Sequence, residues 1–339
     1  MDSRREHDVL IIGGGPAGST CARFARKHGL KVAVIERTGK CHVKRTSAGI
    51  FDHTWPALEL SPHEYPYPMR SPNASVFRTF NNGKELTTMF KIVVDKLNRY
   101  VYLPNRDEFD NWLLSLANQA GCIVIRDHAV RPEDIEFNNK QYAVRVGNEI
   151  HTAPFLVGAA GTFCPVYRRF FNNVNAWPGQ RTLLTEAEVP EQEYCGPSYV
   201  SYFNFMGTGV FGWTYIIGDG RLHIGTAQLS RQPELKKKDI LFDEFVDFIR
   251  SKGYLARDFD PKQYHVSGGM IRAFANRPMT TPDGSCHVIG DAAGLLQSDC
   301  YTGITNAIYS GRYCADAIAQ AETSPRIRKN LNRYWQLEC

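Results

Sequence analysis

The sequence predicts an α/β protein: a Rossmann-like domain built from separated segments, with an inserted α+β domain that contains an antiparallel sheet. Three observations favour this fold class. A strand, a glycine-rich turn, a helix and a second strand follow one another within residues 8–35. A strand and a glycine turn return at residues 287–294, before a long helix. Between them, residues 181–224 alternate apolar and polar side chains, which is typical of antiparallel strands.

The composition is that of a globular protein with room for two folded units. The chain has 339 residues, 43% apolar and 22% charged, and its longest apolar runs are too short to cross a bilayer. Its net charge of +5 is mild and gathers in no basic stripe, so we expect no nucleic-acid partner. The first residues show no apolar leader pattern, and we therefore expect a cytoplasmic protein.

The cysteines and histidines do not have the spacing of a metal site or of a disulfide framework. The nine cysteines include no C-x-x-C pair, and the ten histidines include no H-E-x-x-H motif. We expect free thiols and no bound metal.

Each further element follows from its pattern. Apolar runs predict strands at residues 8–12, 31–35, 122–125, 142–146, 155–158 and 287–290. Amphipathic patterns predict helices at residues 19–28, 107–120, 240–252 and 303–321. Residues 56–100, rich in Pro, Asn and aromatic side chains, predict the strands and loops of an inserted region.

The glycine turn predicts a dinucleotide site. Gly13, Gly15 and Gly18 have the G-x-G-x-x-G spacing, directly after a strand and at the start of a helix. The first glycine permits the tight turn, the second lets the backbone approach a pyrophosphate, and the third allows close helix packing. Glu36 ends the next strand, 21 positions after Gly15, where its carboxylate accepts hydrogen bonds from a ribose.

A second signature indicates which dinucleotide is bound. The strand at 287–290 ends in Gly290-Asp291, and here the sequence resembles the FAD-dependent oxidoreductases of the p-hydroxybenzoate hydroxylase fold. The resemblance implies that Asp291 binds the ribityl chain of FAD, with Gly303 and Ile304 near the flavin ring. From the residues alone, the alternative for Asp291 is a helix N-cap.

The same resemblance implies a full cofactor site and a division into domains. Its FAD contacts are Gly13, Gly15, Ala17, Gly18, Glu36, Arg37, Thr46, Ser47, Gly49, Arg106, Ala129, Asp291, Gly303 and Ile304. For Arg106 the alternative is a surface salt bridge. We expect an FAD-binding domain at 1–60, 96–170 and 281–322, a substrate domain at 61–95 and 171–280, and a C-terminal segment at 323–339.

Two further stretches narrow the resemblance to the geranylgeranyl reductase family, flavoproteins that saturate isoprenoid double bonds. Residues 301–318 are similar to that family, as is the pattern Phe211-Gly-Trp213-Thr-Tyr215 with Gly225 after it. The resemblance implies that Trp213 and Tyr215 line an apolar cavity for a hydrophobic, isoprenoid substrate. The alternative for both residues is an ordinary core strand.

The chain departs from the family at two places. Thr46 or Ser47 stands where the family has a cysteine near the flavin, and Ala160 replaces an acid in the segment 158–161. A hydroxyl offers only a neutral hydrogen bond, so a role that needs a thiolate is not expected. Thr46, Ser47 and Tyr215 are the catalytic candidates, and the candidate proton donor is a tyrosine or an ordered water near Tyr215 or Tyr301.

We therefore predict an FAD-dependent oxidoreductase that reduces isoprenoid carbon–carbon double bonds. The alternatives are an aromatic monooxygenase or halogenase of the same fold, and an FAD-binding subunit without catalysis. The second G-x-G-x-x-G spacing, at Gly207, Gly209 and Gly212, lies inside the alternating stretch 181–224 and not at a strand–helix turn. The electron donor, NAD(P)H or a small electron carrier, is therefore expected to visit transiently. For residues 325–335, which mix cations with aromatics, the alternatives are peripheral membrane contact and a solvated helix.

Overall fold

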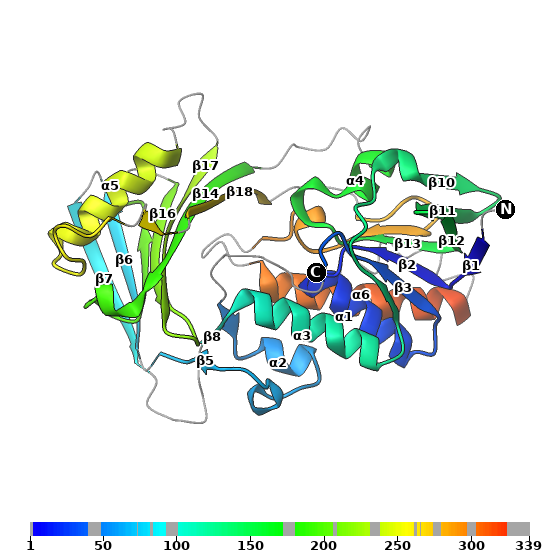
Figure 1. The fold of residues 1–339 in the computed structure, drawn as a ribbon, viewed down its shortest axis with the longest axis horizontal. Helices are drawn as coiled ribbons and strands as arrows, with labels where there is room; N and C mark the ends of the chain where they lie inside the picture. The colour runs from blue at the N-terminus through cyan, green and yellow to red at the C-terminus, as the bar shows by residue number, and fades with distance from the viewer. Residues whose placement is uncertain are drawn as a thin grey trace.

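The computed structural model describes residues 3–39, 49–72, 74–81, 84–92, 101–171, 180–205, 209–230, 238–260, 263–264, 266–273, 279–296 and 303–323. These residues form two lobes, side by side along the long axis of the molecule (Figure 1). One lobe is a parallel sheet packed between helices and a smaller sheet. The other is a large, mostly antiparallel sheet that carries one helix.

The parallel sheet has five strands in the order β19-β13-β2-β3-β9. They are β2 (Val9–Ile12), β3 (Val32–Ile35), β9 (Ile123–Ile125), β13 (Phe155–Gly158) and β19 (Cys286–Val288). Its central strands, β2, β3 and β13, are buried at every position, which is why they read as unbroken apolar runs in the sequence.

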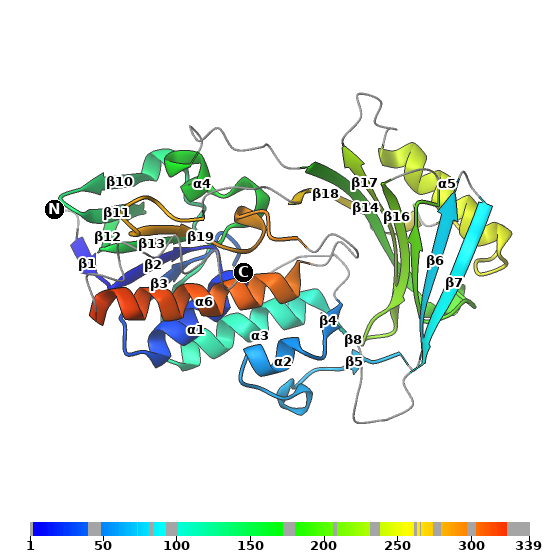
Figure 2. The same ribbon diagram turned by 180° about the vertical axis from the view of Figure 1, so that it is seen from behind.

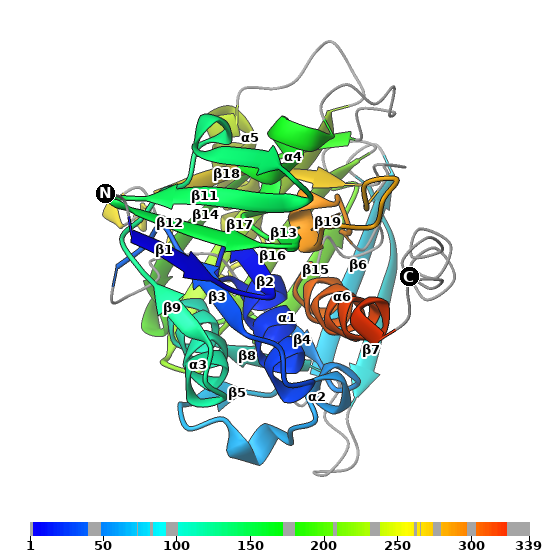
Figure 3. The same ribbon diagram turned by 90° about the vertical axis from the view of Figure 1, so that its right-hand side faces the viewer.

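Alternate residues of these strands face two different layers. Val9 and Ile11 pack on helices α1 (Pro16–Lys27), α3 (Arg106–Gln119) and α6 (Ile304–Thr323). Leu10 and Ile12 face the opposite layer, which contains α4 (Pro165–Phe170) and a four-stranded sheet. That sheet has the order β1-β12-β11-β10, with β1 (Ser3–Glu6), β10 (Ile135–Asn138), β11 (Gln141–Val146) and β12 (Glu149–Ala153). Figure 3 shows the helices on one side of the parallel strands and β11 and β12 on the other.

The second lobe is built on a seven-stranded sheet in the order β18-β14-β17-β16-β15-β6-β7. Its strands are β6 (Ala74–Asn81), β7 (Lys84–Ile92), β14 (Gln180–Pro190), β15 (Tyr199–Phe203), β16 (Val210–Ile216), β17 (Arg221–Ser230) and β18 (Val266–Ala273). All neighbours are antiparallel except β6 and β15. Helix α5 (Lys238–Ser251) covers one face through Phe242, Phe245, Val246 and Ile249.

The opposite face of this sheet, which we call the inner face, turns toward the first lobe (Figure 2). Phe211, Trp213 and Tyr215 of β16 point to it and pack against Phe51 and Leu103. The strands that meet it are β4 (Ile50–Phe51), β8 (Val101–Pro104) and β5 (Met69–Arg70), in the order β4-β8-β5. Helix α2 (Thr54–Ala57) follows β4.

The predicted fold class is confirmed, with differences in detail. The helix expected from residue 19 begins at Pro16, because proline is well suited to the first helical position. Strands β1, β10 and β12 were not predicted, because they are short and rich in charged or polar residues. Segments 61–95 and 171–280 contribute strands to one sheet, and the exact domain boundaries stay a prediction.

Two sequence predictions concern surfaces and membranes. No helix formed by the described residues is long and apolar enough to cross a membrane. The segment 325–335, for which membrane contact was one alternative, lies outside the described residues.

Candidate functional site

The three glycines of the first turn have three different structural reasons. Gly13 has a φ of +108°, and a Cβ there would lie 2.6 Å from the carbonyl oxygen of Ala159. At Gly18 a Cβ would lie 1.9 Å from the carbonyl oxygen of Gly13. Only a residue without a side chain allows the helix to lie this close to the turn. At Gly15 a Cβ would meet no atom within 4 Å, so this side of the turn is open.

The open side lies at the N-terminus of α1. Gly15 is the N-cap residue and offers no side chain to the first turn, and Pro16 occupies the first helical position. Unpaired N–H groups and the partial positive charge of a helix N-terminus favour an anion. The turn therefore has the space and the charge to accept a pyrophosphate, because no side chain at position 15 fills the open side of the backbone.

Glu36 supports this turn directly. Its carboxylate is buried; Oε2 accepts a hydrogen bond from Gly14 N at 2.6 Å, and Oε1 accepts from Thr38 N at 2.9 Å. Glu36 thus joins the glycine turn to the end of β3, a structural role that the sequence did not predict. Arg37, the next predicted contact, is exposed. Whether Glu36 also accepts from a ribose stays a prediction.

The late Gly-Asp turn comes close to the first one. Gly290 begins the 3₁₀ helix η6 (Gly290–Ala292) with a φ of +59°, and its N–H donates to Ser310 Oγ of α6 at 3.0 Å. A Cβ on Gly290 would lie 3.0 Å from the Cβ of Ala17. A Cβ on Gly303 would lie 2.9 Å from Asp291 Oδ1. The Gly290-Asp291 turn therefore has Ala17 beside its first residue and Gly303 beside its second, and buried Ile304 begins α6 next to Gly303.

Arg106 is the first residue of α3 and is buried. Its Nε donates to Asp110 Oδ1 at 3.0 Å and its Nη2 to Asp110 Oδ2 at 2.9 Å, so the alternative of a surface salt bridge is wrong: the ion pair lies in the interior. Burial lowers the pKa of Arg106, but the carboxylates of Asp110, Asp291 and Glu186 outweigh it and raise that pKa. The guanidinium thus interacts both with the late turn and with the large sheet.

The remaining predicted cofactor residues are more dispersed. Ala129 is exposed on the rim of a shallow hollow, and its neighbour His128 donates from its backbone N to Glu36 O at 3.1 Å. Gly49 is buried at the start of a described segment, and Ala160 lies against Gly13. Three candidates lie outside the described residues: Thr46, Ser47 and Tyr301.

Trp213 and Tyr215 lie in an aromatic row on the inner face. The Trp213 ring covers Gly225 so closely that a Cβ there would lie 2.2 Å from Trp213 Cζ2. The Tyr215 ring stacks on Tyr199 at 4.3 Å, and its hydroxyl lies 2.8 Å from Ser201 Oγ. Both side chains are buried, as the core-strand alternative requires. Contact with a substrate stays a prediction for both.

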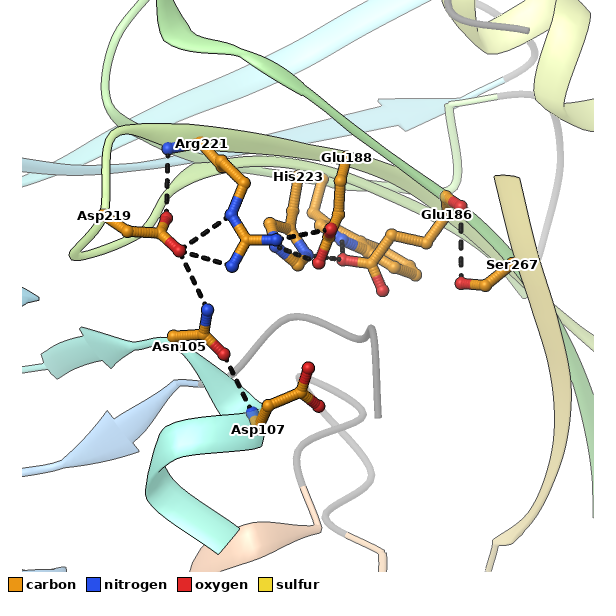
Figure 4. A network of polar contacts seen from close by, with 9 residues as sticks. Asn105, Asp107, Glu186, Glu188, Asp219, Arg221, His223 and Ser267 are labelled. Atoms are coloured by element: carbon orange, nitrogen blue, oxygen red, sulfur yellow. Dashed lines mark hydrogen bonds and ion pairs between the residues drawn. The ribbon is translucent and has the colours of Figure 1, made fainter. Parts of the chain in front are cut away.

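A polar network beside this row was not predicted from the sequence (Figure 4). It runs from Asn105 and Asp107 at the start of α3, through Asp219 and Arg221, to Glu188, His223 and Glu186 on β14 and β17. A sequence signal exists: residues 186 and 188, and again 221 and 223, are charged or titratable, and they alternate with the apolar residues 187, 189, 222 and 224. Period-two charges place such groups on one face, here the inner one.

The fold and the glycine turn together define a class: an oxidoreductase built on a flavin-binding fold. A family model described as pyridine nucleotide-disulphide oxidoreductase matches residues 7–108, which include the turn and Glu36. Among solved structures, a geranylgeranyl bacteriochlorophyll reductase-like protein from Thermoplasma acidophilum superposes with a TM-score of 0.81 at 22% identity, covering 99% of this chain and 83% of that one. The myxobacterial chondrochloren halogenase, an FAD-dependent halogenase, has a TM-score of 0.74 at 21% identity, covering 98% and 79%.

Within that class, the resemblance to the geranylgeranyl reductase family is confirmed. The digeranylgeranylglycerophospholipid reductase of Thermoplasma volcanium is 25% identical over 95% of this chain and 81% of its own length. Digeranylgeranylglycerophospholipid reductase 1 of Methanococcoides burtonii is 25% identical over 98% of this chain and 80% of its own length.

Proposed function

We propose that the flavin of this protein is FAD, and that the pyrophosphate binds at Gly13–Gly18. The support is the open turn at Gly15, the helix N-terminus behind it, and Glu36 placed against the same turn. In this proposal Asp291 binds the ribityl chain, and Gly303, Ile304 and Arg106 lie near the flavin ring. When reduced, a bound flavin supplies a hydride to an acceptor.

We further propose that the acceptor is a carbon–carbon double bond of an isoprenoid chain, as in a digeranylgeranylglycerophospholipid. One observation carries this proposal: similarity to reductases of that lipid extends over nearly the whole chain, including both lobes. The aromatic row of Phe211, Trp213 and Tyr215, which faces the flavin-binding lobe, supports an apolar chain as the substrate. In this proposal the buried row would also keep water away from a reduced flavin.

An FAD-dependent halogenase or monooxygenase is the second candidate, because the fold of the chondrochloren halogenase is also similar. The segment Gly212-Trp213-Thr-Tyr215-Ile-Ile lacks the second Trp and the Pro expected of a halogenase, which favours the reductase. The electron donor of the proposed reaction is NAD(P)H or a small electron carrier that visits the flavin. A structural flavin without catalysis is the third candidate.

The cofactor proposal is tested by releasing and identifying the flavin of the purified protein, and by the variant Glu36→Lys. The substitution replaces an acceptor of the turn by a cation, so we expect FAD affinity to fall at least about tenfold. Glu136→Lys, the same charge reversal at an exposed position of β10 outside the predicted site, serves as the matched control. A protein that stays colourless when FAD is added contradicts the proposal. Unchanged affinity in Glu36→Lys contradicts the role of Glu36.

The reaction proposal is tested by asking what reoxidises the reduced protein. Under argon, we expect addition of digeranylgeranylglycerophospholipid to restore the absorbance of oxidised flavin. If the flavin is reoxidised only by dioxygen, and an added aromatic compound is then hydroxylated or halogenated, the second candidate is right. If neither the lipid nor dioxygen reacts, and no donor reduces the flavin at a useful rate, the flavin is structural.

A further inference from the structure

The centre of the inner face holds a buried acid–base pair that none of the predicted sites includes. Glu186 of β14 and His223 of β17 are 1% and 2% exposed. His223 Nδ1 lies 2.6 Å from Glu186 Oε1, a short, charge-assisted contact. The other nitrogen, Nε2, lies 3.3 Å from Glu188 Oε1. A histidine between two carboxylates in the interior is a costly arrangement unless it carries a charge.

The pair adjoins the aromatic row. The Trp213 indole N–H donates to the same Oε1 of Glu186 at 3.3 Å, so this oxygen is shared by the imidazole and the ring predicted to contact the substrate. Figure 4 shows Glu186 and His223 side by side on the face that looks across to the start of α3. Glu186 also acts on Arg106, which in turn interacts with Asp291 of the late Gly-Asp turn. Glu186 therefore contacts the aromatic row directly and acts electrostatically on Arg106, one of the residues proposed to lie near the flavin.

The charges around His223 favour its protonated form. Burial lowers its pKa, but Glu186 and Glu188 outweigh this and raise the pKa of His223 to about 9. At the far end of the polar network, Asp219 of the β16–β17 turn pairs with Arg221 of β17, so their charges compensate each other. Arg106 is paired with Asp110 on α3. The neighbours on β16 and β18, Trp213 and Ser267, are uncharged. At neutral pH the pair therefore consists of a protonated imidazole and a carboxylate, one proton more than a neutral imidazole and a carboxylate would hold.

We propose that the Glu186–His223 pair holds the proton that completes reduction of the double bond, a role that rests on the proposed function. Saturation of a C=C bond needs a hydride on one carbon and a proton on the other. A bound, reduced flavin would be the source of the hydride, that is, of one proton together with two electrons.

The proton leaves His223 Nδ1 across the 2.6 Å contact to Glu186, and Glu186 delivers it to the second carbon. Two new C–H bonds form, the π bond is lost, and His223 is left neutral. Glu188, whose side chain is 11% exposed, lies between Nε2 and Arg221 and returns a proton from solvent to the imidazole. Glu186 is the residue that would meet the substrate, and His223 is a positioning and proton-storing residue behind it.

The first test is independent of turnover. The imidazole signals of histidine-labelled protein, with its flavin oxidised, are followed by NMR between pH 6 and pH 10. We expect one buried histidine to be protonated at pH 7 and to titrate near pH 9, and to be missing from His223→Gln. His63→Gln, a surface histidine outside the network, is the control that removes an ordinary signal. If His223→Gln does not fold, the His223 signal is identified by sequential NMR assignment of the parent protein. A neutral His223 at pH 7 overturns the proposal.

The second test separates the proposal from the function on which it rests. In His223→Gln and Glu186→Gln, we expect dithionite to reduce the flavin as in the parent, while reoxidation by the lipid slows by about 10²-fold or more. In the parent this step falls off above about pH 9, and in His223→Gln that pH limb disappears. If the parent reacts with the lipid and folded His223→Gln is equally fast, the proton role is wrong and the reductase stands. If the lipid fails to reoxidise the parent, both proposals fall.

Discussion

The substitution Gly225→Ala, which adds a single methyl group, tests how tightly the inner face is packed. Trp213 lies flat across it, and a Cβ at residue 225 would approach Cζ2, Cε2 and Nε1 of the indole to 2.2, 2.3 and 2.8 Å. Ordinary carbon–carbon contact begins at about 3.5 Å, so in Gly225→Ala the ring must move by about 1 Å or more. The ring is buried among Phe211, Tyr215 and Leu103, which leaves it little room.

The cost of Gly225→Ala follows from two effects. Overpacking a dense core costs about 1–3 kcal/mol, and displacing the indole also weakens its hydrogen bond to Glu186, worth about 1 kcal/mol. We expect the free energy of unfolding to fall by about 2–4 kcal/mol, measured by urea unfolding followed by circular dichroism.

The same argument predicts a rescue. In Trp213→Phe the smaller ring leaves space above Gly225, so adding Gly225→Ala to it should cost clearly less than in the parent. The difference is the coupling energy of a double-mutant cycle, and we expect it to exceed about 1 kcal/mol. A cost below about 0.5 kcal/mol for Gly225→Ala, or no coupling to Trp213, refutes this description of the inner face.

Two further predictions concern the glycine turn and the buried pair. Gly18→Ala places a Cβ 1.9 Å from the carbonyl oxygen of Gly13, a backbone atom that cannot turn aside, so we expect loss of flavin absorbance from the purified protein. For His223 the folded pKa, about 9, lies above the unfolded value of about 6.5, so its stabilisation is complete below pH 6.5 and is lost as the pH rises through 9. Urea unfolding should show up to about 3 kcal/mol lost between these pH values, and a smaller loss in His223→Gln.

The dinucleotide turn was predictable because its parts are local in sequence. Gly13, Gly15 and Gly18 lie within one turn and one helix start, and Glu36 follows after a single βα unit. Their spacing alone therefore carries their geometry. The meeting of this turn with Asp291 needed the family resemblance, since these residues are joined only by the order of strands in the parallel sheet.

The Glu186–His223 pair could not be predicted from a local sequence motif. Its two residues are 37 positions apart, and they meet because β14 and β17 pair in one particular register, Glu186 opposite Gly225 and Glu188 opposite His223. A shift of that register by one residue would turn the charges to the face of α5. Strand register across a separation of 37 residues is set by the whole sheet, and no short motif encodes it.

Arg106 shows the intermediate case. The family resemblance implied a flavin contact for Arg106, and the i, i+4 spacing to Asp110 is compatible with the ion pair that the structure shows. The burial of Arg106 did not follow from the sequence, because burial depends on how distant parts of the chain pack around the start of α3.

The central claim is that this flavoprotein adds hydrogen to an isoprenoid double bond, and the mass of the lipid after a single turnover tests it most directly. Protein with its flavin reduced is mixed under argon with digeranylgeranylglycerophospholipid, and the lipid is then extracted. Mass spectrometry gives the mass and amount of the product, which is compared with the amount of flavin that was reoxidised. We predict a gain of two hydrogen atoms per flavin, with no oxygen or halogen incorporated. A lipid of unchanged mass beside reoxidised flavin, or a product that gains oxygen once air is admitted, would contradict it.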